Sequence, residues 1–217
     1  MPTIYVSPLT GSSLINALKK HGFAVEFTAA AQNLHPSVAA HPDMLMCKLG
    51  AAPESEVVFA NLSILTRDYP GDARYNAICL DRYFVHRLDI TAPELLKKAS
   101  KHGLELINVR QGYAKCSSVV VDGKSIITAD NGVASALEKL QGVEVLRVRP
   151  GFVKLTGFNT GFIGGASGRI GNDVWFNGDI TAHPNWIEIK DFIESRGLGV
   201  RWFDYELEDV GSIIERI

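Results

Sequence analysis

Cysteine is scarce in this chain, which has three among its 217 residues, and none of them forms a CxxC pair. Three cysteines cannot all pair with one another, so a disulfide framework is not expected. The first residues, MPTIYVSPLTG, contain neither the basic nor the apolar segment of a secretory signal. We therefore expect a cytoplasmic protein with reduced thiols.

Long apolar runs and an excess of charge of one sign are also missing. No run approaches the roughly 18 apolar residues of a membrane span, and 22 basic against 24 acidic side chains leave a net charge of −2. Nucleic acids and anionic membranes select basic clusters, so neither is an expected partner. No metal-ligand spacing, P-loop or dinucleotide fingerprint occurs, so the sequence predicts no metal site and no cofactor.

Four stretches have helical periodicity, and each is followed by a glycine, the residue that best tolerates the left-handed backbone after a helix. The helices are expected at about 11–21, 92–102, 132–140 and 184–196, and the glycines are Gly22, Gly103, Gly142 and Gly197.

The segments before three of these helices repeat. Asp89-Ile90-Thr91-Ala92 recurs letter for letter at 179–182, and Asp130 stands at the matching place before the third helix. Two strands precede each aspartate, most clearly SSVVV and SIITA, whose Asp122-Gly123 connection predicts a type I′ turn. A third strand follows each helix, so the unit is strand, strand, helix, strand.

Five such units fit the chain as one domain, 1–217. Complete copies cover 76–111, 114–150 and 159–205, and partial copies cover 3–28 and 43–61, the latter (DMLMCK to EVVFAN) without a clear helix. An amphipathic last helix is expected at about 207–216. Because a short ββαβ unit cannot bury its sheet alone, the repeat predicts an α/β propeller of five units with pseudo-fivefold symmetry.

This repeat resembles the pentein, or guanidine-modifying-enzyme, fold of arginine deiminases, amidinotransferases and a ribosome-associated anti-association factor. More narrowly, GYAKCSSVVVDGKSIITAD and GFIGGASGRIGNDVWFNGDITAHP resemble an uncharacterised bacterial family that has this fold and no assigned activity. For catalytic members the resemblance implies a cysteine nucleophile in a Gly-rich stretch near the C-terminus, a histidine and paired carboxylates at the axis. Here that stretch, Gly161 to Gly168, carries Ser167, and no cysteine follows Cys116.

Cys116 is the candidate nucleophile, because its G-x-x-x-C-S context is similar to that family's stretch and Lys115 beside it favours the thiolate. The alternative is a small apolar strand residue. Two near-copies, His41-Pro42-Asp43 and His183-Pro184-Asn185, offer histidines for proton transfer. Their alternative is a turn or helix start.

The repeated aspartates, Asp89, Asp130 and Asp179, would form a carboxylate ring that attracts guanidinium or ammonium groups if they face the centre. Repeated helix capping is the alternative. Asn177 and the following glycine favour a ligand role for Asp179, since glycine permits close backbone approach.

The Gly-dense segment around Gly164 and Gly165 offers backbone amides for a bound anion or carboxylate, or else marks a sharply curved strand.

Three functions follow as hypotheses. The first is a protein that binds a small polar ligand, guanidino or amino, at the axis without established catalysis, through residues Asp130, Asn177, Asp179, Gly164, Gly165, His41 and Asp43. The second is a cysteine-dependent hydrolase or amidino/imino-transfer enzyme acting on C–N bonds of guanidino compounds, with Cys116 as nucleophile and His183 moving protons. The third is a protein-binding scaffold. The oligomeric state is left open, a homo-oligomer included.

Overall fold

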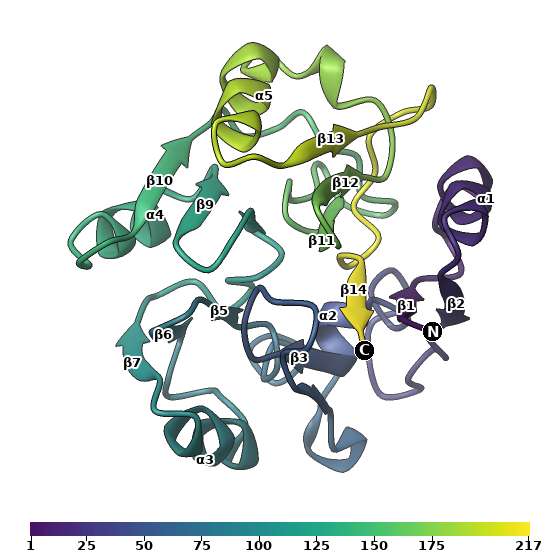
Figure 1. Ribbon diagram of the computed structural model, residues 1–217. Helices are drawn as coiled ribbons and strands as arrows, with labels where there is room; N and C mark the ends of the chain where they lie inside the picture. Colours follow the sequence, from purple (N-terminus) through teal and green to yellow (C-terminus); the bar gives the residue numbers. More distant parts are fainter.

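The computed structural model describes all residues 1–217 and is a mixed α/β structure with five small sheets (Figure 1). The sheets contain, in spatial order, the strands β14 (Ile214–Arg216), β1 (Thr3–Val6) and β2 (Ala24–Phe27); β3 (Met46–Lys48) and β4 (Val57–Phe59); β5 (Ile78–Cys79), β6 (Tyr83–His86) and β7 (Glu105–Asn108); β8 (Ser118–Val120), β9 (Ser125–Thr128) and β10 (Glu144–Arg147); and β11 (Ser167–Ile170), β12 (Asp173–Phe176) and β13 (Gly199–Arg201).

The helices are short, and each of them except α2 connects two parallel strands of one sheet along the chain. They are α1 (Ser12–Lys20), α2 (Pro42–Leu45), α3 (Pro93–Lys101), α4 (Asn131–Leu137) and α5 (Trp186–Glu194), with two 3₁₀ turns, η1 (Leu62–Ile64) and η2 (Ile180–Ala182). All four helices expected from periodicity are present. The glycine expected after each has a positive φ, between 71° and 84°. None of the helices has the length and apolar character required to span a membrane.

The repeated unit is confirmed by strand pairing in the three copies expected to be complete. In each, the first strand is antiparallel to the second, and the third is parallel to the second after the intervening helix: β5-β6-β7 with α3, β8-β9-β10 with α4, and β11-β12-β13 with α5. The parallel return across a helix is what a strand–helix–strand connection requires.

The expected C-terminal helix at 207–216 is wrong, because the chain ends in strand β14. This strand pairs antiparallel with β1, with Ile4 opposite Glu215, so both ends of the chain lie in one sheet (Figure 1). The first unit begins directly with β1 and has no preceding strand of its own. β14 therefore supplies the missing antiparallel neighbour and satisfies backbone groups that an amphipathic helix would leave open.

Two local expectations also need correction. The hairpin of β8 and β9 forms, but neither Asp122 nor Gly123 has a positive φ, so its turn is not type I′. Gly123 is needed for close approach instead, since its carbonyl accepts a hydrogen bond from Asp81 N at 2.9 Å and a Cβ would lie 1.7 Å from Asp81 Oδ1.

In the unit at 43–61, residues expected to start a strand form α2, because Pro42 suits a first helical turn. After β4 comes only the 3₁₀ turn η1, which Asn61 caps by accepting from Ser63 N at 3.1 Å. The helix that the sequence lacks here is thus replaced by a single short turn.

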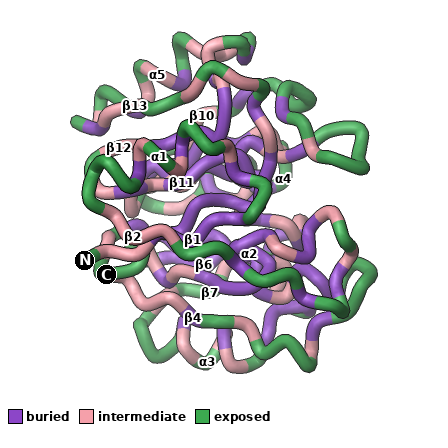
Figure 2. The backbone as a smooth tube through the Cα atoms, turned by 90° about the vertical axis from the view of Figure 1, so that its right-hand side faces the viewer, coloured by how far each residue is buried: buried purple, intermediate pink, exposed green.

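Separate hydrophobic clusters connect the sheets in pairs. One cluster joins the sheet of β3 and β4 to the sheet of β5–β7, and a second joins that sheet to the sheet of β8–β10. A third joins the sheet of β8–β10 to the sheet of β11–β13, and a fourth joins that sheet to the sheet of β1. The smallest cluster joins β1 and β14 to β3. Figure 2 shows buried backbone running through the middle of the molecule, with the exposed segments toward the outside. α3 and α5 lie at opposite outer ends in both views.

Candidate functional site

The candidate site is built from the five segments that lead into the first strand of each sheet. Asn76, Cys116, Gly165 and Ser212 each stand two residues before such a strand, namely β5, β8, β11 and β14. The fifth segment, His41 to Asp43, precedes β3. Residues far apart in the sequence therefore meet because they hold similar places in a repeated unit.

Hydrogen bonds link these segments in a continuous circle. Ser212 N donates to Gly165 O at 2.7 Å, and Gly165 N donates to Cys116 O at 2.9 Å. Cys116 N donates to Asn76 Oδ1 at 2.9 Å, and Asn76 Nδ2 donates to Asp43 O at 3.3 Å. Asp43 N completes the circle by donating to the carbonyl of Gly211 at 3.0 Å. Interior backbone groups that no sheet satisfies thus find partners here.

A cavity of about 430 Å³ opens beside this circle, within the size range of small-molecule sites. Its polar lining includes His41, Cys116 and Asp209, and its walls are largely aromatic and aliphatic. The complete lining is His35, Val38, His41, Met44, Arg67, Asp68, Tyr69, Asp72, Tyr113, Cys116, Leu155, Phe158, Thr160, Phe162 and Asp209.

Cys116 is a buried thiol, only 2% exposed, held between two polar side chains. Its Sγ donates to Asp43 Oδ2 at 2.9 Å and accepts from Asn76 Nδ2 at 3.2 Å. Burial and the carboxylates of Asp43 and Asp209 raise the pKa of the Cys116 thiol well above its ordinary value. The thiol is consequently protonated in the free protein at neutral pH.

Asp209 is a buried carboxyl group on the segment before β14. Its Oδ2 accepts from Phe162 N at 2.9 Å and its Oδ1 from Gly211 N at 3.0 Å. Burial is the main cause, and the nearby Asp43 carboxylate the second, of a pKa raised to about 7. Asp209 therefore changes charge in the neutral range.

His41 lies across from Asp209, with its Nδ1 3.9 Å from Asp209 Oδ1, beyond hydrogen-bonding distance. Burial lowers the pKa of His41, despite the opposing effects of Asp43 and Glu208. Its imidazole is therefore neutral and able to accept a proton.

Unpaired polar atoms concentrate at this site. Of the seven buried side-chain nitrogen and oxygen atoms without a hydrogen-bond partner in the protein, four belong to three of its residues: both ring nitrogens of His41, Oδ1 of Asp43 and Oδ1 of Asp72. His41 and Asp72 line the cavity, and Asp43 contacts Cys116. Buried polar groups are rarely left unpaired, because each costs free energy.

Two glycines allow the acidic and basic side chains to reach the centre. A Cβ on Gly165 would lie 2.0 Å from Asp209 Oδ1, and one on Gly211 would lie 2.1 Å from the His41 Cβ. Gly211 also has a φ of 81°, which a side chain rarely adopts. Gly165 was expected to contact a ligand, and its observed neighbour is this carboxylate.

Comparison with known families gives one match, to a model described as a family of unknown function (DUF6873), over residues 53–214. The match covers most of the chain. The chain belongs to the DUF6873 family. The matched region includes Asn76, Cys116, Gly165, Asp209 and Ser212, whereas His41 and Asp43 precede it. Searches among curated proteins and solved structures gave no match.

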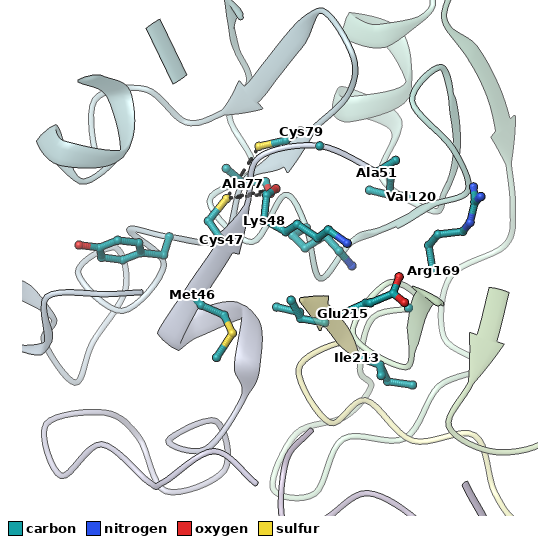
Figure 3. A pocket seen from close by; sticks show the side chains of 15 residues that line it. Met46, Cys47, Lys48, Ala51, Ala77, Cys79, Val120, Arg169, Ile213 and Glu215 are labelled. Carbon is teal, nitrogen blue, oxygen red and sulfur yellow. Dashed lines mark hydrogen bonds between the residues drawn. The ribbon is translucent and has the colours of Figure 1, made fainter. Parts of the chain in front are cut away.

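A second, smaller cavity of about 50 Å³ in this DUF6873 chain is lined by Lys48, Lys115 and Arg169 among others. Figure 3 shows Lys48 reaching toward its middle, with Cys47 and Cys79 at one end and Arg169 with Glu215 at the other. The sulfur atoms of Cys47 and Cys79 are 3.8 Å apart and both thiols are free.

His183 and Asp130 line a third cavity, of about 120 Å³, which does not include Cys116. His183 accepts from Asn185 N through Nδ1 at 3.1 Å, and its Nε2 contacts Arg149 O at 3.1 Å. Both ring nitrogens are therefore occupied by backbone groups. His183 therefore lines a different cavity from the candidate nucleophile, whereas His41 lines the same one.

None of the three repeated aspartates lines the large cavity. Asp130 caps α4 by accepting from Val133 N at 2.8 Å, and Asp179 caps η2 by accepting from Thr181 N at 2.8 Å. The Asp89 side chain is 63% exposed and pairs with Arg87. All three follow second strands of equivalent hairpins, as the repeat predicts, but their local roles are capping and surface pairing.

Asn177 and Gly164 have structural partners as well. Asn177 Oδ1 accepts from Gly11 N at 3.0 Å and from the Tyr205 hydroxyl at 2.9 Å. The Gly164 carbonyl oxygen lies 3.0 Å from the Ser212 hydroxyl oxygen and accepts from Lys115 Nζ at 3.4 Å. Gly164 thus borders the central network, whereas Asn177 connects more distant segments.

Sequence reasoning missed Asp209, Asp72, Asn76 and Ser212 as site residues. The signal for two of them was the run Asp209-Val210-Gly211-Ser212, since a glycine in the middle of the expected helix at 207–216 argues against a regular helix. The signal for Asn76 was its place before AICL, which matches that of Cys116 before its own strand. Nothing local marks Asp72.

Proposed function

We propose that this DUF6873 protein binds a small cationic ligand, guanidino or amino, in the cavity lined by His41, Cys116 and Asp209. The observation that carries the proposal is the set of unpaired buried atoms on His41 and Asp72 beside that cavity. A ligand with several N–H groups would satisfy them, because a carboxylate oxygen accepts and a neutral imidazole has one acceptor nitrogen.

The charged and aromatic residues that line this cavity favour a cationic ligand. Three carboxyl residues line the cavity, Asp68, Asp72 and Asp209, against one guanidinium, that of Arg67. A planar guanidinium pairs with carboxylates through two parallel hydrogen bonds. The rings of Tyr113 and Phe162, 6.2 Å apart between centroids, offer faces that attract a cation.

The proposal includes a pentein-like architecture in which the five units close into a ring with pseudo-fivefold symmetry. Its support is the circle of hydrogen bonds through the five segments, the hydrophobic clusters that connect successive sheets, and the presence of both chain ends in one sheet. Such a ring would place the cavity on its axis.

Thermal denaturation in the presence of methylguanidine, methylamine and methylurea tests the binding proposal. We expect the two cations to raise the melting temperature, and the neutral, similarly shaped methylurea to have no effect. A ligand at one hundred times its Kd stabilises by about 2.7 kcal/mol. Asp209→Asn should remove most of the shift, whereas Asp89→Asn, on an exposed aspartate, should retain it. No shift by either cation, or equal shifts by all three compounds, would refute the proposal.

A second candidate function is cysteine-dependent cleavage of a guanidino C–N bond. It is favoured by the convergence of the Cys116 thiol, the neutral His41 imidazole and the Asp209 carboxyl on one cavity. In this step the neutral His41 takes the proton of the Cys116 thiol, and the resulting thiolate forms an S–C bond with the guanidinium carbon. The C–N bond then breaks as the leaving amine takes that proton from His41. Water adds to the same carbon and gives one proton to His41, the C–S bond breaks, and the sulfur is reprotonated as a neutral urea product leaves.

Mass spectrometry during incubation with methylguanidine and with longer alkylguanidines tests this candidate. A covalent adduct on the peptide that contains Cys116, together with release of free amine, is expected for the wild type. Cys116→Ala should abolish both, while Cys79→Ala, at a buried thiol outside the cavity, should not. Amine release that survives Cys116→Ala would exclude Cys116 as the nucleophile.

A further inference from the structure

A series of buried polar groups, joined by hydrogen bonds, begins at the Cys116 thiol, and the proposed function does not use it. The Ser212 hydroxyl donates to Asp43 Oδ2 at 2.6 Å, the same oxygen that accepts from Cys116 Sγ. Lys115 Nζ donates in turn to Ser212 Oγ at 3.0 Å. A continuous path of hydrogen bonds therefore joins the thiol to an amine.

The two ends of this path lie in different cavities. Cys116 lines the large cavity, and Lys115, its neighbour in the sequence, lines the small cavity shown in Figure 3. Ser212 and Asp43 between them are 0% and 1% exposed. The thiol and the amine thus belong to separate cavities, and the Ser212 hydroxyl and the Asp43 carboxylate link them by hydrogen bonds.

Backbone strain supports a specific role for Ser212. Among the non-glycine residues of the chain it has the one positive φ, 69°, a conformation that costs free energy for any residue with a Cβ. Glycine would occupy this position without strain. The hydroxyl, which donates to Asp43 and accepts from Lys115, is the feature that a glycine would lose.

The charges along this path of hydrogen bonds indicate what it does. A thiolate at Cys116 would stand beside the Asp43 carboxylate and near Asp209, so two negative groups oppose its formation. The Lys115 ammonium is the positive group bonded into the same network. Although burial lowers the pKa of Lys115, the Asp43 and Cys116 charges oppose that shift.

We propose that Lys115 and Ser212 are positioning residues that hold Asp43 and supply the counter-charge for ionisation of Cys116 from the side opposite the ligand cavity. The inference rests on the proposed role of the Cys116 site. Around the thiol and the amine lie further groups that titrate or carry charge, namely His41, Cys47, Lys48, Asp72, Tyr113, Arg169, Asp209 and Glu215.

The test is the pH dependence of Cys116 ionisation in the free protein. It is measured by the rate of iodoacetamide alkylation of the peptide that contains Cys116, and by the ultraviolet thiolate absorbance that Cys116→Ala removes, which requires no reagent access. Lys115→Met should raise the midpoint by about one pH unit or more, with alkylation below the midpoint about tenfold slower. Lys115→Arg, which keeps the charge, should restore much of this loss.

Lys48→Met is the matched control, because Lys48 lines the same small cavity as Lys115 but makes no hydrogen bond to Ser212. Its midpoint should equal that of the wild type. Ser212→Gly and Ser212→Ala both lose the hydroxyl, but only the alanine retains the strained Cβ. We expect the same rise of about half a pH unit in both, whatever their difference in melting temperature.

A wild-type midpoint in Lys115→Met and in both Ser212 variants would overturn the inference, as would an equal shift in Lys48→Met. If Lys115→Met does not fold, the two Ser212 variants decide the question. Neither readout involves a ligand, so a failed search for guanidino ligands would refute the proposed function and leave this result standing. Conversely, wild-type midpoints in these variants would overturn this inference without deciding whether methylguanidine binds.

Discussion

Asp209→Asn should change how the stability of the protein depends on pH. The Asp209 carboxyl has a pKa of about 7 in the folded protein, against an ordinary value of 3.8. Between these values the folded state holds a proton that the unfolded state has released. Folding is therefore favoured at low pH, and the free energy of unfolding falls as pH rises from about 4 to about 7.

The size of this effect follows from the pKa difference. About three pKa units, at about 1.4 kcal/mol each, amount to about 4 kcal/mol. Asparagine, like the protonated carboxyl, carries no charge, but its amide nitrogen cannot accept one of the two hydrogen bonds that the Asp209 oxygens accept from Phe162 N and Gly211 N. The variant should therefore be less stable than the wild type near pH 4, by about 1–3 kcal/mol. Between pH 4 and pH 7 the difference should move in favour of the variant by up to about 4 kcal/mol, because the variant buries no charge.

Urea denaturation at intervals between pH 4 and pH 8.5 measures this difference at each pH. Subtracting the two curves removes the contribution of every other group that titrates in both proteins. A difference that stays constant across the range would refute the reasoning, since it would mean that Asp209 is ionised throughout. In the same proteins, binding of methylguanidine to the wild type should weaken about tenfold per pH unit below pH 7, as Asp209 gains its proton.

Three further outcomes are expected. His86 is fully buried with a pKa lowered to about 4 by burial, so it should cost about 3 kcal/mol of stability as pH falls from 6.5 to 4, and His86→Gln should lose that slope in urea denaturation. Gly165→Ala places a Cβ against Asp209 Oδ1 and should destabilise by about 1–3 kcal/mol and weaken methylguanidine binding; an unchanged melting temperature would contradict the close approach. Deletion of residues 214–217 removes β14 and exposes the edge of β1, so cooperative thermal unfolding at the wild-type temperature would contradict its role in the sheet.

Local sequence patterns determined the repeated unit. A glycine after each helix, apolar positions at helical spacing and paired β-rich runs act within a few residues of one another, so α1, α3, α4 and α5 and three complete units could be predicted without tertiary information. Cys116, His41 and Asp43 were also identifiable, because they stand in short motifs beside those elements.

Only the tertiary structure decided which of these residues share a site. The Cys116 thiol shares a cavity with His41 and not with His183, and Asp209 and Ser212 come from a segment expected to be helical. The physical reason is that β14 forms by pairing with β1 at the other end of the chain, so its conformation depends on a neighbour about 210 residues away. Amphipathic character alone favoured a helix there, but the open edge of β1 made a strand the more favourable structure, and that strand carries two of the central residues into place.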